Sequence, residues 1–245
     1  MIKETALSVR DRVSDGRGTQ RLGGVLDILV VFVPFVLVAG IGEWLGSDTA
    51  LGPIVINMAY VLGIVIASVV LQSRGTGWRQ IGLARPDSWR RTVLLGVGVA
   101  VGTILAGVAF RGIILNFPGL EIQPSDQSQY SPLHRNLPLL LLMLVLSWTT
   151  IAFGEEMLFR AFLTNSLAGL FQHTQARWAI ALIGSSLAFG VIHYDYGLAG
   201  MVETTLMGLF LGFAYLRTGR NLWVPIIAHG LMNSLKFVLV FSGAQ

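Results

Sequence analysis

Residues 154–163 read Gly-Glu-Glu-Met-Leu-Phe-Arg-Ala-Phe-Leu, which places two adjacent carboxylates and an arginine inside an apolar segment. The preceding residues 139–151 are mostly Leu, Met, Val and other uncharged side chains. An ionisable group in the middle of a membrane helix costs about 2.5–3.5 kcal/mol on insertion scales, so one that is retained there marks a candidate functional site. The segment therefore predicts a membrane protein with a site at Glu155.

The composition supports a membrane protein. Of the 245 residues, 53% are hydrophobic and 12% are charged, and the mean hydropathy is +0.69, which is typical of an integral membrane protein. The chain has no cysteine, which excludes disulfides, iron–sulfur clusters, thiolate zinc sites and cysteine nucleophiles. The net charge of +4 comes from basic residues in loops and in the N-terminal tail, so we expect a lipid bilayer and no nucleic acid as partner.

Seven apolar segments are each long enough, at about 20 residues, to span a bilayer as a helix. They occupy residues 22–42, 51–71, 91–115, 138–163, 178–197, 199–216 and 221–242. The predicted fold class is all-α, a polytopic transmembrane helical bundle with an intramembrane active site. Eight spans are the alternative, through an additional half-helix within 160–177 or two short spans counted as one. The glycine spacings Gly98–Gly102 and Gly208–Gly212 favour close helix packing and would also permit dimers.

The distribution of basic residues predicts the domain organisation and the orientation. Residues 1–21 form a polar, basic tail, which we expect to be poorly ordered or to lie at the lipid headgroups, and residues 22–245 form a single transmembrane domain. With seven spans, the basic residues of the tail, the second loop and the sixth loop share one side. They are Lys3, Arg10, Arg12, Arg17, Arg21, Arg74, Arg79, Arg85, Arg90, Arg91, Arg217 and Arg220. The positive-inside rule then places the N-terminus in the cytoplasm and the C-terminus outside.

The polar residues of the later spans suit hydrolysis of a peptide bond. Burial in an apolar surround strengthens a carboxylate as a base, so Glu155 can activate a water molecule, and His193 can hold that water or pass a proton. His229 and Asn233 are four residues apart and project from one helix face, where they can donate to an oxyanion. One such donor contributes about 10²–10³ in rate.

Other polar residues have structural explanations. Glu156 and Arg160, four residues apart, can neutralise each other and leave Glu155 as the unpaired carboxylate. Phe189 is expected to pack as a wall of the pocket. Asp195 suggests a solvated loop, whereas Glu203 and Asp27 are carboxylates without an evident partner. In the seven-span topology Glu155 and His193 differ in depth by roughly 10 Å, which tilt or a broken helix would have to absorb.

Three segments of the chain, taken together and in order, resemble a known family. The segments GEEMLFRAFL (154–163), FGVIH (189–193) and NLWVPIIAHGLMNS (221–234) contain the patterns EExxxR, FxxxH and HxxxN. This arrangement resembles the CPBP or Abi family, which joins type II CAAX prenyl endopeptidases with bacteriocin-processing enzymes. The loop GWRQIGLARP (77–86) is also similar, so the resemblance covers a protease core at about residues 75–240.

The resemblance implies an intramembrane endopeptidase that acts on a membrane-associated or lipidated protein or peptide. It implies that Glu155 and His193 activate water and that His229 and Asn233 stabilise the oxyanion. The family has been described both as glutamate-type and as metalloproteases. If the reaction depends on a metal, Glu155, His193 and His229 could hold zinc with a water. We favour a reaction without a metal or other cofactor, since HExxH is absent and a metal site would leave no separate base.

Two other classes of function compete with the protease. Buried Glu and His also form proton relays in transporters, although no inverted repeat or matched pair of broken helices is visible. A non-catalytic scaffold or immunity protein could keep the fold, but it would not need an unpaired intramembrane glutamate. The compact length favours the inner membrane of a bacterial or archaeal cell. A prenylated tail, a peptide leader, a sorting helix and a membrane-bound regulator all fit as substrates.

Overall fold

A computed structural model describes residues 2–46, 51–115 and 128–244, and every regular element in these ranges is a helix. The long helices are α1 (Ile2–Leu45), α2 (Leu51–Ser73), α3 (Trp89–Leu115), α7 (Arg177–Val191), α8 (Gly197–Arg217) and α9 (Trp223–Ser242). A composite helix lies between α3 and α7. The 3₁₀ turn η1 (Ser128–Leu133) precedes it, and the 3₁₀ turn η4 (Tyr194–Tyr196) joins α7 to α8. Within the described ranges, six helices are long and apolar enough to cross a bilayer. The chain is an integral membrane protein, and the predicted polytopic helical bundle is confirmed.

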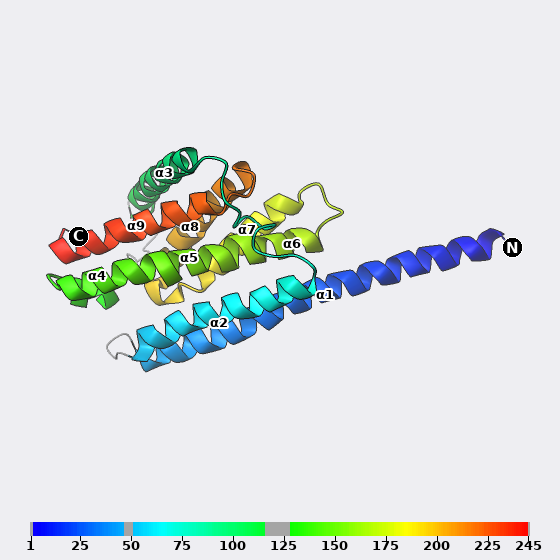
Figure 1. Cartoon of the computed structure of the whole chain (residues 1–245), viewed down its shortest axis with the longest axis horizontal. Coiled ribbons are helices and arrows are strands. Elements are labelled where there is room, and N and C mark those ends of the chain that lie inside the picture. Colours follow the sequence, from blue (N-terminus) through cyan, green and yellow to red (C-terminus); the bar gives the residue numbers. More distant parts are fainter. Residues whose placement is uncertain (1, 47–50, 116–127, 245) are drawn as a thin grey trace.

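The N-terminal tail is helical and not poorly ordered, and its predicted position at the lipid headgroups stays a prediction. Helix α1 begins at Ile2 and runs without a break into the first span, and its first half projects away from the bundle (Figure 1). Adding a residue to an existing helix costs far less than starting a new one. The apolar span can therefore carry the helix into the polar tail.

The composite helix runs through Leu137–Leu170 and contains Glu155. It consists of α4 (Leu137–Leu146), the π segment η2 (Ser147–Ile151), α5 (Ala152–Glu155), the π segment η3 (Glu156–Leu163) and α6 (Thr164–Leu170). Its 34 residues are about 50 Å long at about 1.5 Å per residue, more than the roughly 30 Å of a hydrocarbon core. The helix therefore extends further than the predicted span 138–163. π segments within α-helices are frequent at functional sites, and here one lies on each side of α5.

Helix α7 is shorter than the predicted span 178–197. It has 15 residues and ends at Val191, after which the chain turns through η4 and enters α8 at Gly197, where φ is +73°. The His193 ring lies 2.7 Å from the Phe189 carbonyl oxygen and so takes a carbonyl group that a continuing helix would use. His193 is therefore at a turn between two helices and not near the far end of a full span.

Glycines at the same spacing pack differently on two helices. On α8, Gly208 lies against Ser186 and Gly212 against Leu182, both of α7. On α3, an added Cβ at Gly98 or Gly102 would meet no heavy atom within 4 Å among the described residues. The predicted close packing is confirmed for α8 and is wrong within this part of the chain for α3.

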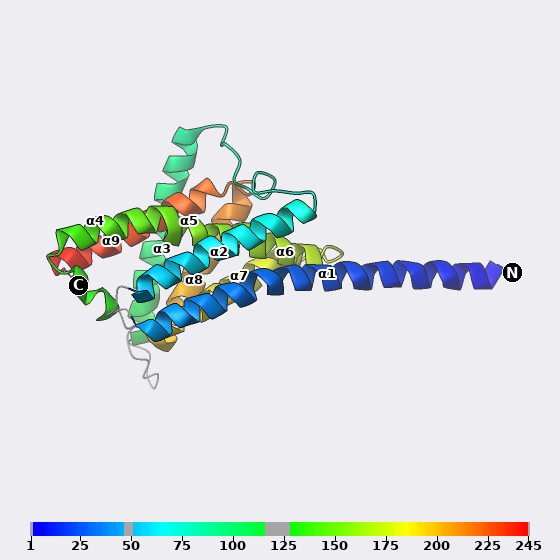
Figure 2. The ribbon, with the colours of Figure 1, turned by 60° about the horizontal axis from the view of Figure 1, so that its bottom comes forward.

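The helices form layers with the composite helix between α2 and α9. Helices α1 and α2 pair on one side of it, and α9 and α3 pair on the other (Figures 1 and 2). The N- and C-termini lie at opposite ends of the molecule (Figure 1). A buried aromatic core surrounds the π segment η3, with the Phe159 ring centroid 5.2 Å from that of Phe189. The middle layer therefore presents Glu155 to side chains from both neighbouring layers.

Candidate active site

Glu155 is the last residue of α5 and is buried, with 3% of its surface exposed. The Tyr60 hydroxyl of α2 donates a hydrogen bond of 2.6 Å to Glu155 Oε1. Glu155 Oε2 has no hydrogen-bond partner among the described residues and lies 3.6 Å from Nε2 of His229. Glu155 therefore has a neutral hydrogen-bond partner on one oxygen, which the sequence did not predict, and the second oxygen remains able to accept a proton.

Glu156 is fully buried and joins two other predicted residues. Its Oε1 lies 2.9 Å from Nδ1 of His229 and 3.0 Å from Nη1 of Arg160, so the predicted pair with Arg160 is present. The guanidinium carbon of Arg160 is also 4.0 Å from the centroid of the Phe189 ring. A carboxylate that pairs with arginine accepts hydrogen bonds, so Nδ1 of His229 is the donor. Its Nε2 is left facing Glu155.

The His193 ring is fixed by the residue four positions earlier. Nδ1 of His193 lies 2.7 Å from the Phe189 carbonyl oxygen. A carbonyl oxygen can only accept, so Nδ1 carries the proton and Nε2 keeps a lone pair in the neutral ring. The two rings also pack with their centroids 4.7 Å apart. Phe189 thus supports both Arg160 and His193, which confirms the predicted packing, but it is fully buried and lines neither of the cavities described below, so it is not a wall of the pocket.

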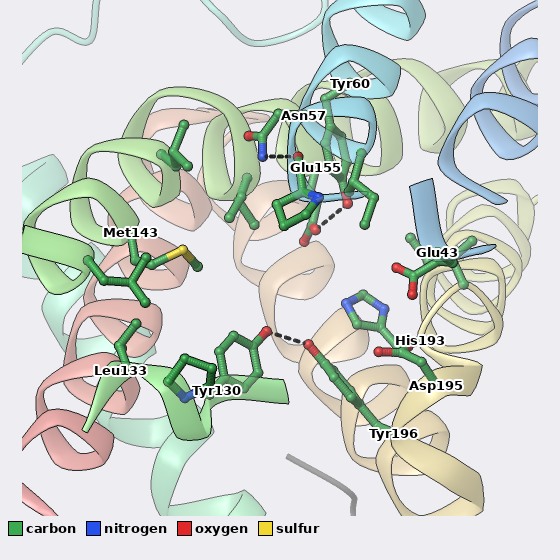
Figure 3. Close-up of a pocket in the computed structure, with 17 residues that line it drawn as sticks. Glu43, Asn57, Tyr60, Tyr130, Leu133, Met143, Glu155, His193, Asp195 and Tyr196 are labelled. Atoms are coloured by element: carbon green, nitrogen blue, oxygen red, sulfur yellow. Dashed lines mark hydrogen bonds between the residues drawn. The ribbon is translucent and has the colours of Figure 1, made fainter. Parts of the chain in front are cut away.

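Two adjoining cavities meet at Glu155. The first, which we call the α2 cavity because Tyr60 of α2 also lines it, has a volume of about 260 Å³. The second, which we call the α9 cavity because His229 of α9 also lines it, has a volume of about 230 Å³. Both are lined by Tyr130, Ile151, Glu155, His193 and Tyr196. Figure 3 shows the α2 cavity, with the Glu155 carboxylate pointing into it from the Tyr60 side.

The α9 cavity brings together all four predicted catalytic residues. Its lining includes Glu155, His193, His229 and Asn233. The difference in depth predicted for Glu155 and His193 is not observed, because α7 ends early and its turn reaches the level of Glu155.

Several residues at the site were not predicted from the sequence. Tyr60 bonds a carboxylate 95 positions away, and no local spacing indicates such a pair. Lys236 lines the α9 cavity, and its position seven residues after His229 could have indicated this. Tyr130 and Tyr196 form a hydroxyl–hydroxyl hydrogen bond of 2.7 Å between the cavities. Burial raises the pKa of Tyr130 to about 12, so this phenol stays protonated.

Three acidic residues that the sequence analysis regarded as structural have defined surroundings. Asp195 lines the α2 cavity instead of a solvated loop. Glu203 pairs with Arg111 through two contacts of 3.0 Å, and Asp27 pairs with Arg74 through two contacts of 2.9 Å. Glu203 and Asp27 therefore do have basic partners, and these lie far away in the sequence.

The donor arrangement does not fit a metal ion. In the ranges that the structure describes, no group of three His, Asp or Glu side chains is close enough to hold one. His229 and His193 use Nδ1 for Glu156 and for a backbone carbonyl, which leaves Nε2 of each ring available, as in metal-ligating histidines. The separation of the side chains is what leaves the tetrahedral zinc set of Glu155, His193 and His229 unassembled among the described residues.

Comparison with known proteins identifies the segment that carries these residues. Residues 137–235 match the family model described as type II CAAX prenyl endopeptidase Rce1-like. The Bacillus subtilis protein YdiL, whose name describes a membrane peptidase, is 33% identical over 98 residues, which are 40% of this chain and 37% of YdiL. CAAX prenyl protease 2 of Saccharomyces cerevisiae is 29% identical over 101 residues, covering 34% of this chain and 32% of that protein. No solved structure matches the chain. The family resemblance of the three motifs is thereby confirmed over residues 137–235, the segment that contains Glu155, His193, His229 and Asn233.

Proposed function

We propose that this protein is an intramembrane endopeptidase that uses Glu155 to activate water. The observation that carries the proposal is that Glu155 of α5, His193 after α7, and His229 and Asn233 of α9 line one cavity. Within it, a buried carboxylate oxygen has no hydrogen bond to any described residue. Such an oxygen can accept a proton from a bound water without first losing another partner. The similarity of residues 137–235 to type II CAAX prenyl endopeptidases supports the same reaction class.

The first step is attack of water on the peptide carbonyl carbon. Glu155 Oε2 takes a proton from the water as the new C–O bond forms. Nε2 of His193, which keeps its lone pair, accepts a second hydrogen bond from the same water and orients it. Tyr60 holds Oε1 of Glu155 and so fixes the direction in which Oε2 points.

The second step is collapse of the tetrahedral intermediate. The Asn233 amide and Nε2 of His229 donate hydrogen bonds to the oxyanion. Because Nδ1 of His229 is already bound to Glu156, this role requires a ring protonated at both nitrogens. Glu156 already neutralises Arg160, so the oxyanion itself balances the charge of the ring. The C–N bond then breaks, and the proton held by Glu155 passes to the leaving amine. No step requires a metal ion.

We infer that the substrate is a membrane-anchored or lipidated peptide, with a prenylated peptide as the first one to test. One relative is named as a CAAX prenyl protease. The α2 cavity is lined largely by apolar side chains that could receive an apolar part of the substrate. They include Pro53, Ile56, Leu133, Leu139, Met143, Leu146 and Ile192. We also infer a cell-membrane location with the N-terminus in the cytoplasm, on the evidence of the basic residues near that end of the bundle.

The test is a cleavage assay with purified protein in lipid and a library of membrane-anchored peptides. We expect Glu155→Gln to abolish cleavage and His229→Ala to slow it by about 10²–10³, the effect of removing an oxyanion donor. A strong chelator should leave the wild-type rate unchanged. Equal cleavage by the wild type and Glu155→Gln would contradict the proposal. Loss of activity with chelator and recovery with zinc would instead assign Glu155, His193 and His229 to a metal.

A further inference from the structure

Lys236 shares one face of α9 with two of the proposed catalytic residues. It follows His229 by seven positions and Asn233 by three, and residues at these spacings lie on the same side of a helix. All three line the α9 cavity. A cation thus faces the space in which the peptide bond would be held.

The ammonium group of Lys236 contacts aromatic rings and no anion. Its Nζ is 3.7 Å from the centroid of the Tyr130 ring and 5.1 Å from that of Tyr196, both distances within the range of cation–π attraction. Among the residues that the structure describes, Lys236 forms no ion pair. Asp195 and Glu155 attract this charge without forming an ion pair with it. Because the charge is drawn partly out of water, the group still favours an incoming anion.

The other charges at the cavity have different contacts. Glu155 accepts from Tyr60, and Glu203 is bound on both oxygens by Arg111. The phenols of Tyr130 and Tyr196 bond each other and direct their rings, not their oxygens, at Nζ. The hydrogen-bond donors of the ammonium are therefore left for a ligand.

We propose that Lys236 binds the terminal α-carboxylate of the peptide substrate, an inference that rests on the proposed endopeptidase function. At about 1.5 Å per residue along α9, Lys236 lies about 4.5 Å beyond Asn233 and about 10 Å beyond His229. An extended peptide covers about 3.3–3.6 Å per residue. A carboxylate on Lys236 therefore places the carbonyl held by His229 and Asn233 within a few residues of the chain end.

The test uses two peptides of one sequence, each anchored through an S-prenylated cysteine and ending in a free acid or in an amide. We expect the wild type to cleave the acid about tenfold faster in kcat/KM, mainly through KM, as loss of one charge-assisted hydrogen bond predicts. Lys236→Met should bring the acid-to-amide ratio close to one, and Lys236→Arg should keep the preference. A preference that persists in Lys236→Met would overturn the inference, and so would an equal slowing of both peptides.

Binding separates this inference from the proposed function. The same peptides, labelled with a fluorophore, are titrated into Glu155→Gln protein in phosphatidylcholine nanodiscs, with or without the additional change Lys236→Met. Tighter binding of the acid only when Lys236 is present supports the carboxylate site, even if the wild type hydrolyses neither peptide and the proposed function fails. Equal binding of acid and amide to Glu155→Gln overturns the site, even if the wild type cleaves both. Melting temperatures establish that each variant is folded.

Discussion

Glu155 and Glu156 are adjacent in the chain but have different surroundings. Glu155 lines both cavities and has one oxygen without a hydrogen bond to the described residues. Glu156 is fully buried between Arg160 and His229. The first can take part in a reaction, whereas the second holds the residues around it. The division follows from the partners that each carboxylate meets, since the residue type is the same.

Replacing Tyr60 with phenylalanine tests whether the hydroxyl positions Glu155. The change removes a 2.6 Å hydrogen bond to Oε1, and a hydrogen bond to a charged group contributes about 1.5–3 kcal/mol. We expect kcat to fall by about tenfold or more, with little change in KM. Tyr215→Phe is the matched control, because this buried hydroxyl bonds Ile81 and Asn165 away from the cavities. An equal loss of kcat in both variants would contradict a positioning role for Tyr60.

Glu156→Gln should destabilise the protein more than Glu155→Gln does. It leaves the buried guanidinium of Arg160 without its counterion, and breaking a buried ion pair by removing one partner costs about 3–5 kcal/mol. Thermal unfolding in detergent measures the difference. The double variant Glu156→Gln, Arg160→Met should recover part of the loss, because it removes the stranded charge. A wild-type melting temperature for Glu156→Gln would show that the pair does not stabilise the fold.

At the scale of elements, the site depends on helices that are irregular or short. Glu155 lies between two π segments of the composite helix, and His193 lies just after the end of α7. Tight packing of α7 on α8 fixes the second of these positions. At Gly190, an added Cβ would collide with Oγ1 of Thr205 and come within 2.6 Å of the Met201 carbonyl oxygen.

Gly190→Ala should therefore separate α7 from α8 and displace His193. Backbone and a hydroxyl of α8 cannot move aside as a flexible side-chain end would. Overpacking of this kind costs about 1–3 kcal/mol, and cleavage should fall as well. Gly98→Ala is the control, since its Cβ meets nothing within 4 Å among the described residues. Melting temperatures and rates measured on both variants decide the matter, and equal behaviour would contradict the packing argument.

At the scale of the whole molecule, the termini lie at opposite ends of the bundle (Figure 1). Because the chain has no native cysteine, single cysteines can report the topology in intact cells. We expect Ala84→Cys, in the loop between α2 and α3, to be protected from a membrane-impermeant thiol reagent. Ala244→Cys, after α9, should react. Labelling of both positions from one side would favour the eight-span alternative.

Some of this arrangement could be predicted from the sequence and some could not. Ionisable residues are rare in apolar segments, so Glu155, His193 and His229 stand out, and the apolar segments themselves predict the helices. The Tyr60 contact could not be predicted, because the residues of this pair lie on different helices. Nor could spacing distinguish Gly208, which packs on α7, from Gly98, which packs on no described residue. The identity of a neighbouring helix is a property of the tertiary fold.

The short helix α7 has a consequence for the surrounding lipid. Its 15 residues are about 22 Å long, less than the roughly 30 Å of a bilayer core, and such hydrophobic mismatch is relieved by local thinning of the bilayer. A depression in the membrane beside His193 would deliver the water that peptide hydrolysis consumes. Val191 and Ile183, which are 57% and 53% exposed, allow a matched comparison. A cysteine at Val191 should react with a water-soluble thiol reagent much faster than one at Ile183, and equal rates would show that the bilayer covers α7 evenly.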